Sequence, residues 1–221
     1  MTEKKFEKPF DARFHDVMLR TAEALLKETR AVYAYTESDE ISLDCPKEWD
    51  FFDRELEKIV SVTASIAGSS FSLAIGAPAA FDSRIVAAVD QAHVVDYFRW
   101  RQADAGRCAL NGWCYWTLRK SGMSVEVATR TLDNKDLSYK NELLHKAGIN
   151  FAKLPAWQRR GTGLYWETVE KEGYNPKKRE KVVAHRQRIR VDEELPAGDA
   201  YDQFLRKLTS ATARLPKGST E

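Results

Sequence analysis

The sequence predicts an α+β fold in which helices cover one face of a mostly antiparallel sheet. Residues 31–35 and 41–43 are short alternating runs on either side of a polar turn, which is typical of a β-hairpin. Segments with apolar residues at helical spacing precede and follow this hairpin. The resulting order of helix, hairpin, helix, strand and helix differs from the regular strand–helix alternation of parallel α/β proteins.

The first half of the chain supplies the hairpin and the helices around it. Residues 11–29 carry apolar side chains on one side and predict a helix. Residues 50–71 predict a longer helix, after which Pro78 breaks the chain. Residues 81–89 are a further strand candidate. Residues 94–118 have a helical pattern and are rich in aromatic side chains.

The second half predicts fewer elements. Residues 135–146 favour a short helix, and Pro155 follows as a break. Residues 161–169 alternate like a strand, and we expect residues 181–191 to pair with it. Residues 201–208 begin a final amphipathic helix.

The composition supports a folded protein with an unevenly distributed charge. Hydrophobic residues make up 43% of the 221 residues and charged residues 31%, so a packed core is expected and wholesale disorder is excluded. The net charge is only +2, but residues 151–190 hold eleven Lys and Arg against four Asp and Glu. Such a local excess of positive charge attracts phosphate, or it belongs to a solvated pair of strands.

The cysteines and the hydropathy pattern indicate in which cellular compartment the protein is expected. Cys45, Cys108 and Cys114 are odd in number and lack CxxC spacing, which argues against a disulfide framework and against a zinc site. The first residues lack the apolar core of a signal peptide. No run approaches the about 18 apolar residues that span a bilayer. We therefore expect a cytoplasmic protein in a reducing compartment, with no membrane partner.

The polar turn of the hairpin is a candidate metal site. Residues 36–40 read TESDE, and carboxylates on a tight turn can hold Mg²⁺ through oxygen. An ordinary polar turn has the same composition. Lys8 precedes a helix that starts near Pro9 and Asp11, where it can meet a phosphate or remain a solvated lysine.

Basic residues elsewhere are candidates for phosphate contacts. Lys58 shares a helix face with Ser61 and Ser65, so it can contact a triphosphate or occupy a half-exposed position. Arg159 and Arg160 carry guanidinium groups, which grip phosphate oxygens in pairs. Together with Lys140, Asn141 and Asn150 they form a cluster rich in basic and amide groups.

The order of these motifs along the chain is more specific than any one of them. The collinear segments are KPFDARF from Lys8, YTESDEIS from Tyr35, Lys58 with Ser61, FDSR from Phe81, RQADA from Arg101, KNEL from Lys140 and RGT from Arg160. Over nearly its whole length the chain resembles the tRNA-histidine guanylyltransferases and their Thg1-like relatives. The SDE turn and the KNEL and RGT segments are the most specific parts of the resemblance.

The resemblance implies a polymerase- and cyclase-like palm domain over residues 1–130 and a smaller C-terminal region of the family's type over residues 131–221. It implies an enzyme that activates the 5′ end of a tRNA with ATP or GTP and then adds a nucleotide in the 3′-to-5′ direction. Mg²⁺ is the implied cofactor, and a homotetramer is the implied assembly.

The resemblance also implies roles for individual residues. Asp39 matches the metal-binding aspartate, and Lys140 and Asn150 match residues linked to activity. The residues matched to nucleotide binding are Lys8, Ser38, Arg54 and Lys58. The residues matched to RNA binding are Arg107, Asn111, Arg159 and Arg160.

The chain departs from the family pattern in two places. The family's HINNLYN motif falls at residues 106–112, which here read GRCALNG and favour the branch that repairs tRNA 5′ ends by templated pairing. The family's first metal carboxylate lies in a DGRxF-like strand before the Lys-Pro segment, whereas this chain starts at Met1. We expect the first palm strand to be missing because the chain starts at an internal Met of a longer gene.

Three hypotheses for function follow. The leading one is a Mg²⁺-dependent nucleotidyltransferase acting on tRNA 5′ ends. The alternative is a catalytically impaired palm remnant that binds tRNA or nucleotide, and a third is an unrelated α+β protein with scattered basic residues. The leading hypothesis expects Asp39 to face Lys8 and Lys58 across a gap wide enough for a magnesium-bound triphosphate.

Overall fold

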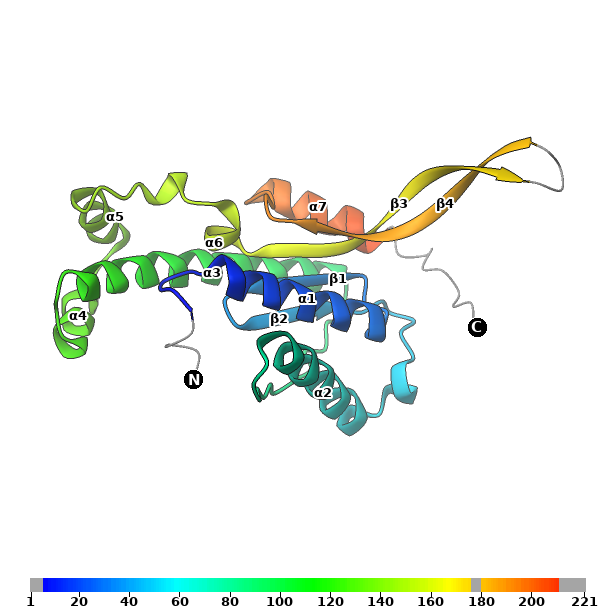
Figure 1. Ribbon diagram of the computed structural model, residues 1–221, viewed down its shortest axis with the longest axis horizontal. Helices are drawn as coiled ribbons and strands as arrows, with labels where there is room; N and C mark the ends of the chain where they lie inside the picture. The colour runs from blue at the N-terminus through cyan, green and yellow to red at the C-terminus, as the bar shows by residue number, and fades with distance from the viewer. Residues whose placement is uncertain (1–5, 176–179, 211–221) are drawn as a thin grey trace.

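The computed structural model describes residues 6–175 and 180–210 and is built on a four-stranded antiparallel sheet (Figure 1). Its strand order is β2-β1-β3-β4. The strands are β1 (Tyr33–Glu37), β2 (Glu40–Asp44), β3 (Thr162–Asn175) and β4 (Glu180–Asp192). The predicted hairpin at residues 31–43 and the predicted pairing of residues 161–169 with 181–191 are both confirmed. The far ends of β3 and β4 extend beyond the body as a two-stranded arm (Figure 1).

The helices confirm most of the sequence predictions. They are α1 (Ala12–Thr29), α2 (Leu56–Ile75), α3 (Gln91–Lys120), α4 (Val125–Leu132), α5 (Leu137–Lys146), α6 (Ala156–Arg160) and α7 (Asp199–Ser210). Asp11 caps α1 by accepting a hydrogen bond from the Arg13 backbone N–H. The short helices α4 and α6 had no counterpart in the sequence prediction.

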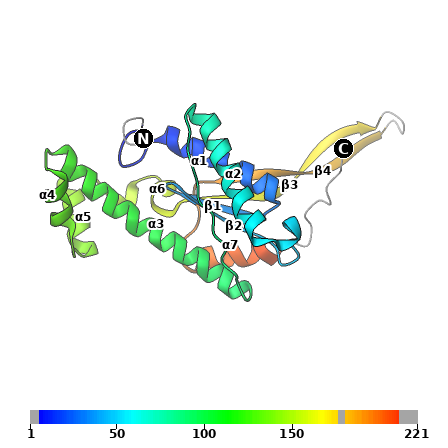
Figure 2. The same ribbon diagram turned by 90° about the horizontal axis from the view of Figure 1, so that it is seen from below.

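Helices cover both faces of the sheet, so the prediction that they cover one face is wrong. Tyr33 and Tyr35 of β1 pack into a core with residues of α3 and α7. Ala34 points the other way and packs with Ala22 and Leu26 of α1. Figure 2 shows the sheet between α1 and α2 on one side and α3 and α7 on the other. Because β1 is buried on both faces, each face needs its own layer of helices.

The C-terminal half of α3 leaves the sheet and carries a small helical lobe. Leu110, Cys114 and Leu118 of α3 pack with residues of α4 and with Leu144 of α5. The predicted boundary near residue 130 stays a prediction. It falls within α4, and β3 from the second predicted region pairs with β1 from the first.

The predicted strand at residues 81–89 does not form. This segment contains no helix or strand, and it lies along α2 instead of joining the sheet. The ring of Phe81 is 5.5 Å from the ring of Phe71, and the Ser83 and Thr63 hydroxyl oxygens are 2.8 Å apart. The start of the segment therefore packs on a helix, whereas Ile85, Val86 and Val89 are exposed, and alternation in the sequence does not show whether a partner strand lies beside such a segment.

Helix α2 begins and ends later than predicted, at Leu56 and Ile75 rather than at residues 50 and 71. By length and composition it meets the requirement for a membrane span, with a mean hydropathy of 1.4 over an 18-residue window of which 17% is buried. The expectation that no segment approaches this requirement is wrong, because serine and glycine interrupt the apolar residues without adding charge. Ile59, Thr63, Ala67 and Phe71 pack inward from α2. The absence of a membrane partner stays a prediction.

Candidate functional site

The β1–β2 hairpin presents its turn at one end of the sheet. Glu37 and Glu40 form the last pair of the ladder, so the turn itself consists of Ser38 and Asp39. Ser38 adopts a φ of 49°, and the Thr36 hydroxyl closes the turn by donating to the Glu40 carbonyl oxygen over 2.9 Å. Both turn residues are exposed. The Asp39 carboxylate is thus exposed to solvent on a turn that the Thr36 hydrogen bond closes.

The middle of α3 faces this turn with charged side chains. Arg101 is only 7% exposed, and its guanidinium contacts the Glu40 carboxylate and lies 4.0 Å from the Glu37 carboxylate. Two turns further along the helix, Arg107 Nε donates to the Asp104 carboxylate over 2.9 Å. The tip and α3 therefore form one charged region rather than two separate surfaces.

Glu37 is the carboxyl group most affected by this region. Burial raises the pKa of Glu37 to about 7, and the negative charges of Asp104 and Asp39 act in the same direction. The Arg101 guanidinium opposes this rise. The carboxyl group next to the turn therefore changes its charge near neutral pH.

The raised pKa of Glu37 predicts a pH-dependent loss of stability. Because the pKa of Glu37 is higher in the folded than in the unfolded state, protonation of Glu37 contributes to the free energy of unfolding. This contribution is complete below about pH 4.5 and is lost as the pH rises through about 7. Relative to wild type, Glu37→Gln is expected to raise the free energy of unfolding at pH 8 by up to about 3 kcal/mol more than at pH 4. Urea unfolding at the two pH values measures this difference. The exposed Glu48→Gln serves as a control, and an equal pH dependence for Glu37→Gln and wild type would contradict the prediction.

Helix α6 brings a basic end against the hairpin and α3. The Tyr35 hydroxyl donates to the Arg160 carbonyl oxygen over 2.9 Å. A Cβ added to Gly106 of α3 would lie 3.3 Å from the Arg159 carbonyl oxygen, so glycine permits this close approach. Arg159 and Arg160 thus lie in the same region as the tip and Arg107. The sequence groups them with Lys140, Asn141 and Asn150 instead.

Lys8 lies close to α3 and α6, immediately before α1. A Cβ on Gly112 of α3 would be 4.0 Å from the Pro9 Cβ atom, and the ring of Phe10 is 5.7 Å from the ring of Trp157. Asn111 is exposed on α3, one turn after Arg107. The structure therefore gathers five of the candidate residues around the hairpin tip and the middle of α3, namely Ser38, Asp39, Arg107, Arg159 and Arg160. Lys8, next to Pro9, and Asn111 lie further along α3, beside Gly112.

Two candidates lie in the helical lobe instead. The carbonyl oxygen of Lys140 accepts a contact from the Cys114 thiol over 3.4 Å, which places it beside the second half of α3. Asn150 caps a 3₁₀ turn by accepting from the Ala152 backbone N–H over 3.1 Å. Cys114 is about 20 Å further along α3 than Arg101, at 1.5 Å per residue. Lys140 and Asn150 thus form a separate group from the hairpin tip.

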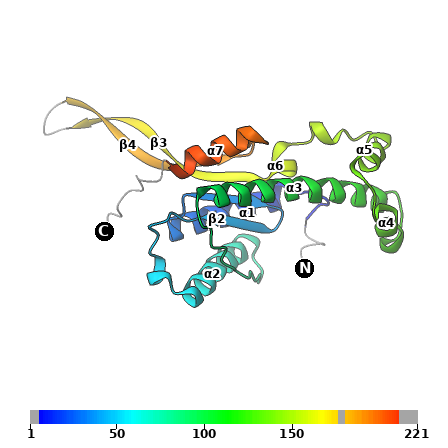
Figure 3. The ribbon, with the colours of Figure 1, turned by 180° about the vertical axis from the view of Figure 1, so that it is seen from behind.

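Lys58 and Arg54 lie at the opposite end of the hairpin, so the expectation that Lys58 faces Asp39 is wrong. Lys58 is in the first turn of α2, where it pairs with Glu55 over 2.9 Å. Arg54 Nε donates to the Trp49 carbonyl oxygen over 2.8 Å. Figures 1 and 3 both place the start of α2 near the end of β2 and far from the turn. The reason is topological, because β2 runs away from the tip before the chain enters α2.

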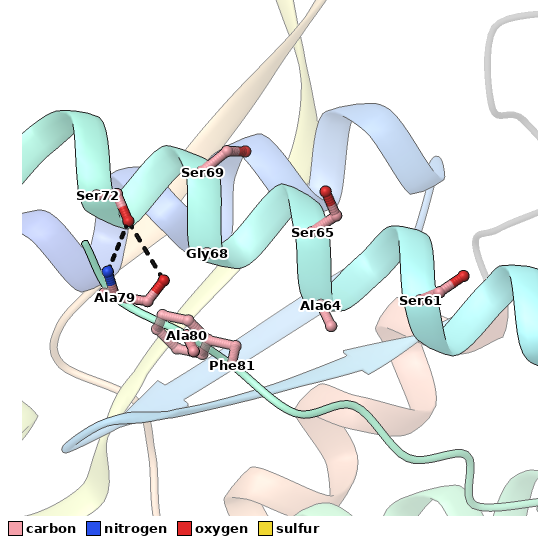
Figure 4. Close-up of a pocket in the computed structure, with 9 residues that line it drawn as sticks. All are labelled: Ser61, Ala64, Ser65, Gly68, Ser69, Ser72, Ala79, Ala80 and Phe81. Carbon is pink, nitrogen blue, oxygen red and sulfur yellow. Dashed lines mark hydrogen bonds between the residues drawn. The ribbon is translucent and has the colours of Figure 1, made fainter.

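The serine face of α2 forms a shallow groove of about 420 Å³ (Figure 4). Figure 4 shows the Ser72 hydroxyl hydrogen-bonded to the backbone of Ala79, and it shows Phe81 below Gly68. The residues that line the groove carry no charge. The groove therefore lacks the positive groups that attract a triphosphate. It gives no support to the prediction that Lys58, Ser61 and Ser65 together contact a phosphate.

The described residues contain no group of three or more His, Cys, Asp or Glu side chains arranged to hold a metal ion. Mg²⁺, however, is commonly bound by one or two carboxylates together with substrate phosphates. The exposed Asp39 fits that mode, with Glu37 two residues earlier at the end of β1. Asp39 thus suits a metal ion that arrives with a triphosphate better than one held by the protein alone.

Sequence reasoning assigned no role to Arg101 or Asp104, although both lie in the RQADA segment. The signal was available in the hairpin. Two glutamates at the base of a two-residue turn repel each other unless a cation lies between them. A buried arginine on a neighbouring helix can supply that cation, but the sequence does not show which helix faces the turn.

Comparisons with known proteins identify relatives over almost the whole chain. Residues 1–89 match the family model for tRNAHis guanylyltransferase, and residues 92–197 match the model for the Thg1 C-terminal domain. A probable tRNA(His) guanylyltransferase of Drosophila melanogaster is 34% identical over 175 residues, which cover 74% of this chain and 61% of the relative. That of Dictyostelium discoideum is 32% identical over 200 residues, which cover 83% of this chain and 78% of the relative.

Solved structures show the same fold with nucleotides bound. A bacterial tRNA(His) guanylyltransferase (Thg1)-like protein in complex with GTP has a TM-score of 0.68 and 28% identity, covering 93% of this chain and 82% of that one. One in complex with ATP has a TM-score of 0.69 and 26% identity, covering 93% and 83%. The chain spans about three fifths of the Drosophila relative's length. The matches in sequence and in structure together show that this chain belongs to the tRNA(His) guanylyltransferase family.

Proposed function

We propose that the chain is a nucleotidyltransferase that extends the 5′ end of a tRNA in the 3′-to-5′ direction with ATP or GTP. The observation that carries the proposal is the exposed Asp39 carboxylate beside the charged middle of α3 and the basic end of α6. Relatives carry the name tRNA(His) guanylyltransferase, and similar structures contain GTP or ATP, which supports this choice of substrates.

The proposed reaction has two displacements at phosphorus. A 5′-phosphate oxygen of the RNA attacks the α-phosphorus of a nucleoside triphosphate, and pyrophosphate leaves. The 3′-hydroxyl of a second nucleotide then attacks the activated 5′ phosphorus, loses its proton, and a nucleoside monophosphate leaves. Catalysis of this kind depends on positioning and on neutralising negative charge rather than on a protein nucleophile.

The residues around the tip would share these tasks. Asp39 would hold a phosphate-bound Mg²⁺, which supplies charge neutralisation at the reacting phosphate. Lys8, Arg107, Arg159 and Arg160 would bind phosphate oxygens of the nucleotide and of the RNA end. Base pairing with the tRNA itself would choose the added nucleotide in the templated repair that the GRCALNG segment favours.

The β3–β4 arm adds a second basic surface for RNA. Directly opposite residues of an antiparallel pair share a face, and the strand register puts Lys171, Arg186, Arg188 and Arg190 on one face of the arm. We call these four residues the basic face. Glu167 and Asp192 are acidic residues on the same side, and Glu167 contacts Arg188 over 2.5 Å and Arg190 over 3.6 Å. The other side carries Glu170 and Glu172 together with Lys181, so the basic face is the more positive of the two.

The basic face predicts a salt-dependent contribution to tRNA binding. Arg186→Gln with Arg190→Gln removes two charges and leaves Arg188 to pair with Glu167. The slope of log K against log salt concentration is expected to become shallower by about 1.5, because fewer counterions are released. Filter binding of tRNA over a range of salt concentrations measures it. Lys181→Gln lies on the opposite face of the same strand and should leave the slope unchanged; equal effects of both variants would argue against this face.

A direct assay tests the proposed function. The purified chain is incubated with a tRNA that lacks its first 5′ nucleotide, together with ATP, GTP and Mg²⁺. Added nucleotides at the 5′ end are the expected result, and a chain that binds the tRNA but never extends it would overturn the proposal. Substituting a tRNA with a changed opposing base tests whether the addition is templated.

A further inference from the structure

Arg101 occupies an unusual position for an arginine. It lies on α3, its side chain is 9% exposed, and its guanidinium carbon is 5.3 Å from the centre of the Trp100 ring. Its terminal nitrogen contacts Glu40 and is 4.0 Å from Glu37. Its buried Nε has no hydrogen-bond partner among the described residues. The charged contacts of this side chain are thus directed at the base of the hairpin turn.

Glu37 and Glu40 are the two residues between which the turn is held. They are the final pair of the β1–β2 ladder, and only Ser38 and Asp39 lie beyond them. Like charges directly opposite on adjacent strands are destabilising. A guanidinium placed beside both carboxylates opposes that repulsion, and its planar fork restricts the directions from which they approach. Arg101 therefore acts on both ends of the turn at once.

We infer that Arg101 is a positioning residue that sets the direction of the Asp39 carboxylate through Glu37 and Glu40. The inference rests on the proposed function, because the direction of Asp39 matters only if that carboxylate holds the metal-bound triphosphate. The charged partners of Arg101 among the described residues are Glu37 and Glu40, and not Asp39. Its effect passes through the two glutamates, and it connects the turn to the same helix that carries Asp104 and Arg107.

The chain offers a matched control on the same helix. Arg99 lies two residues before Arg101, and its guanidinium pairs with Asp202 of α7, whose side chain is 11% exposed. This pair also ties α3 to a neighbouring element through a partly buried carboxylate. It serves the α3–α7 contact, however, and not the hairpin turn. Arg99→Gln therefore reports the loss of a partly buried ion pair of α3 without the loss of the contact to the turn.

Hydrogen exchange of the peptide covering residues 35–42 tests the inference without relying on catalysis. Arg101→Gln is expected to speed exchange at the turn by about tenfold or more, because a local opening becomes easier. Arg99→Gln should leave this peptide unchanged. Unchanged exchange at the turn in Arg101→Gln, or equal acceleration in both variants, would overturn the inference. Arg101→Lys, which keeps the charge but not the fork, replaces Arg101→Gln if the latter fails to fold.

Kinetics with the shortened tRNA provide the second measurement. Arg101→Gln is expected to lower kcat by about 10- to 100-fold, as for a displaced catalytic group, with a smaller change in KM for the nucleotide. Arg101→Lys should recover part of kcat, whereas Arg99→Gln should retain it. A drop in kcat that is equal in Arg99→Gln and Arg101→Gln would contradict positioning. If wild type itself never extends the tRNA, the proposed function fails, and hydrogen exchange still decides whether Arg101 holds the turn.

Discussion

Replacing Asp39 with alanine is expected to abolish extension of a shortened tRNA while leaving tRNA binding nearly intact. Asp39 is the exposed carboxylate of the two-residue turn, and the basic residues around it are supplied by other elements. Losing it removes a ligand for the phosphate-bound metal, which contributes several kcal/mol to transition-state stabilisation, so the rate should fall by a factor of about 100 or more. Binding depends mainly on phosphate contacts that the variant keeps.

The Asp39 prediction needs a charge control and a shape control. Asp133→Asn removes an exposed aspartate at the end of α4, in the lobe away from the turn, and should retain wild-type extension. Asp39→Asn keeps the shape of the side chain but loses the charge, and it should be as impaired as Asp39→Ala. Single-turnover extension and tRNA binding are measured on the same preparations. Substantial extension by Asp39→Ala would show that this carboxylate is not the metal ligand.

Gly161→Ala is expected to destabilise the fold by roughly 2–4 kcal/mol, the sum of an overpacking cost and a left-handed backbone cost. Gly161 has a φ of 69°, and a Cβ at this position would lie 2.5 Å from the Tyr35 ring. Tyr35 is 1% exposed and cannot move away without disturbing the core. The substitution should also displace Arg160, whose carbonyl oxygen accepts from the Tyr35 hydroxyl.

Gly148→Ala separates the two components of this cost. Gly148 has a φ of 78°, but nothing lies within 4 Å of an added Cβ. Gly148→Ala should therefore lower the free energy of unfolding only by the backbone component, roughly 1 kcal/mol. Urea unfolding of both variants measures the difference. Similar losses of stability at the two positions would mean that contact with Tyr35 is relieved at little cost, and the argument for close packing of α6 would fail.

Local patterns were sufficient to predict elements that depend on neighbours in sequence. The helix at residues 11–29 follows from its apolar periodicity and from Asp11 as its cap. The hairpin follows from two alternating runs around a polar turn, and Asp39 could be placed at its tip on that basis. The same reasoning misassigned residues 81–89, because the composition of a strand does not ensure a partner strand, and here Phe81 packs on α2 while Ile85, Val86 and Val89 are exposed.

Relations between distant segments could not be predicted in this way. The sequence analysis grouped Lys58 with Asp39, yet the direction of β2 carries the chain away from the turn before α2 begins. It also placed all helices on one face, whereas β1 is buried on both. Arg101 escaped notice because its importance depends on which residues of α3 face the turn, and packing rather than spacing sets that choice.

The sequence alone determined the helices and strands of the sheet region, the exposed acidic turn and the order of motifs that marks the family. Each of these depends on backbone preferences and side-chain periodicity over a few residues. Only the tertiary structure decided that α3 and α6 bring their arginines to the turn, and that Lys58, Lys140 and Asn150 lie elsewhere. Those placements arise from burying both faces of one central strand, which is a property of the whole chain.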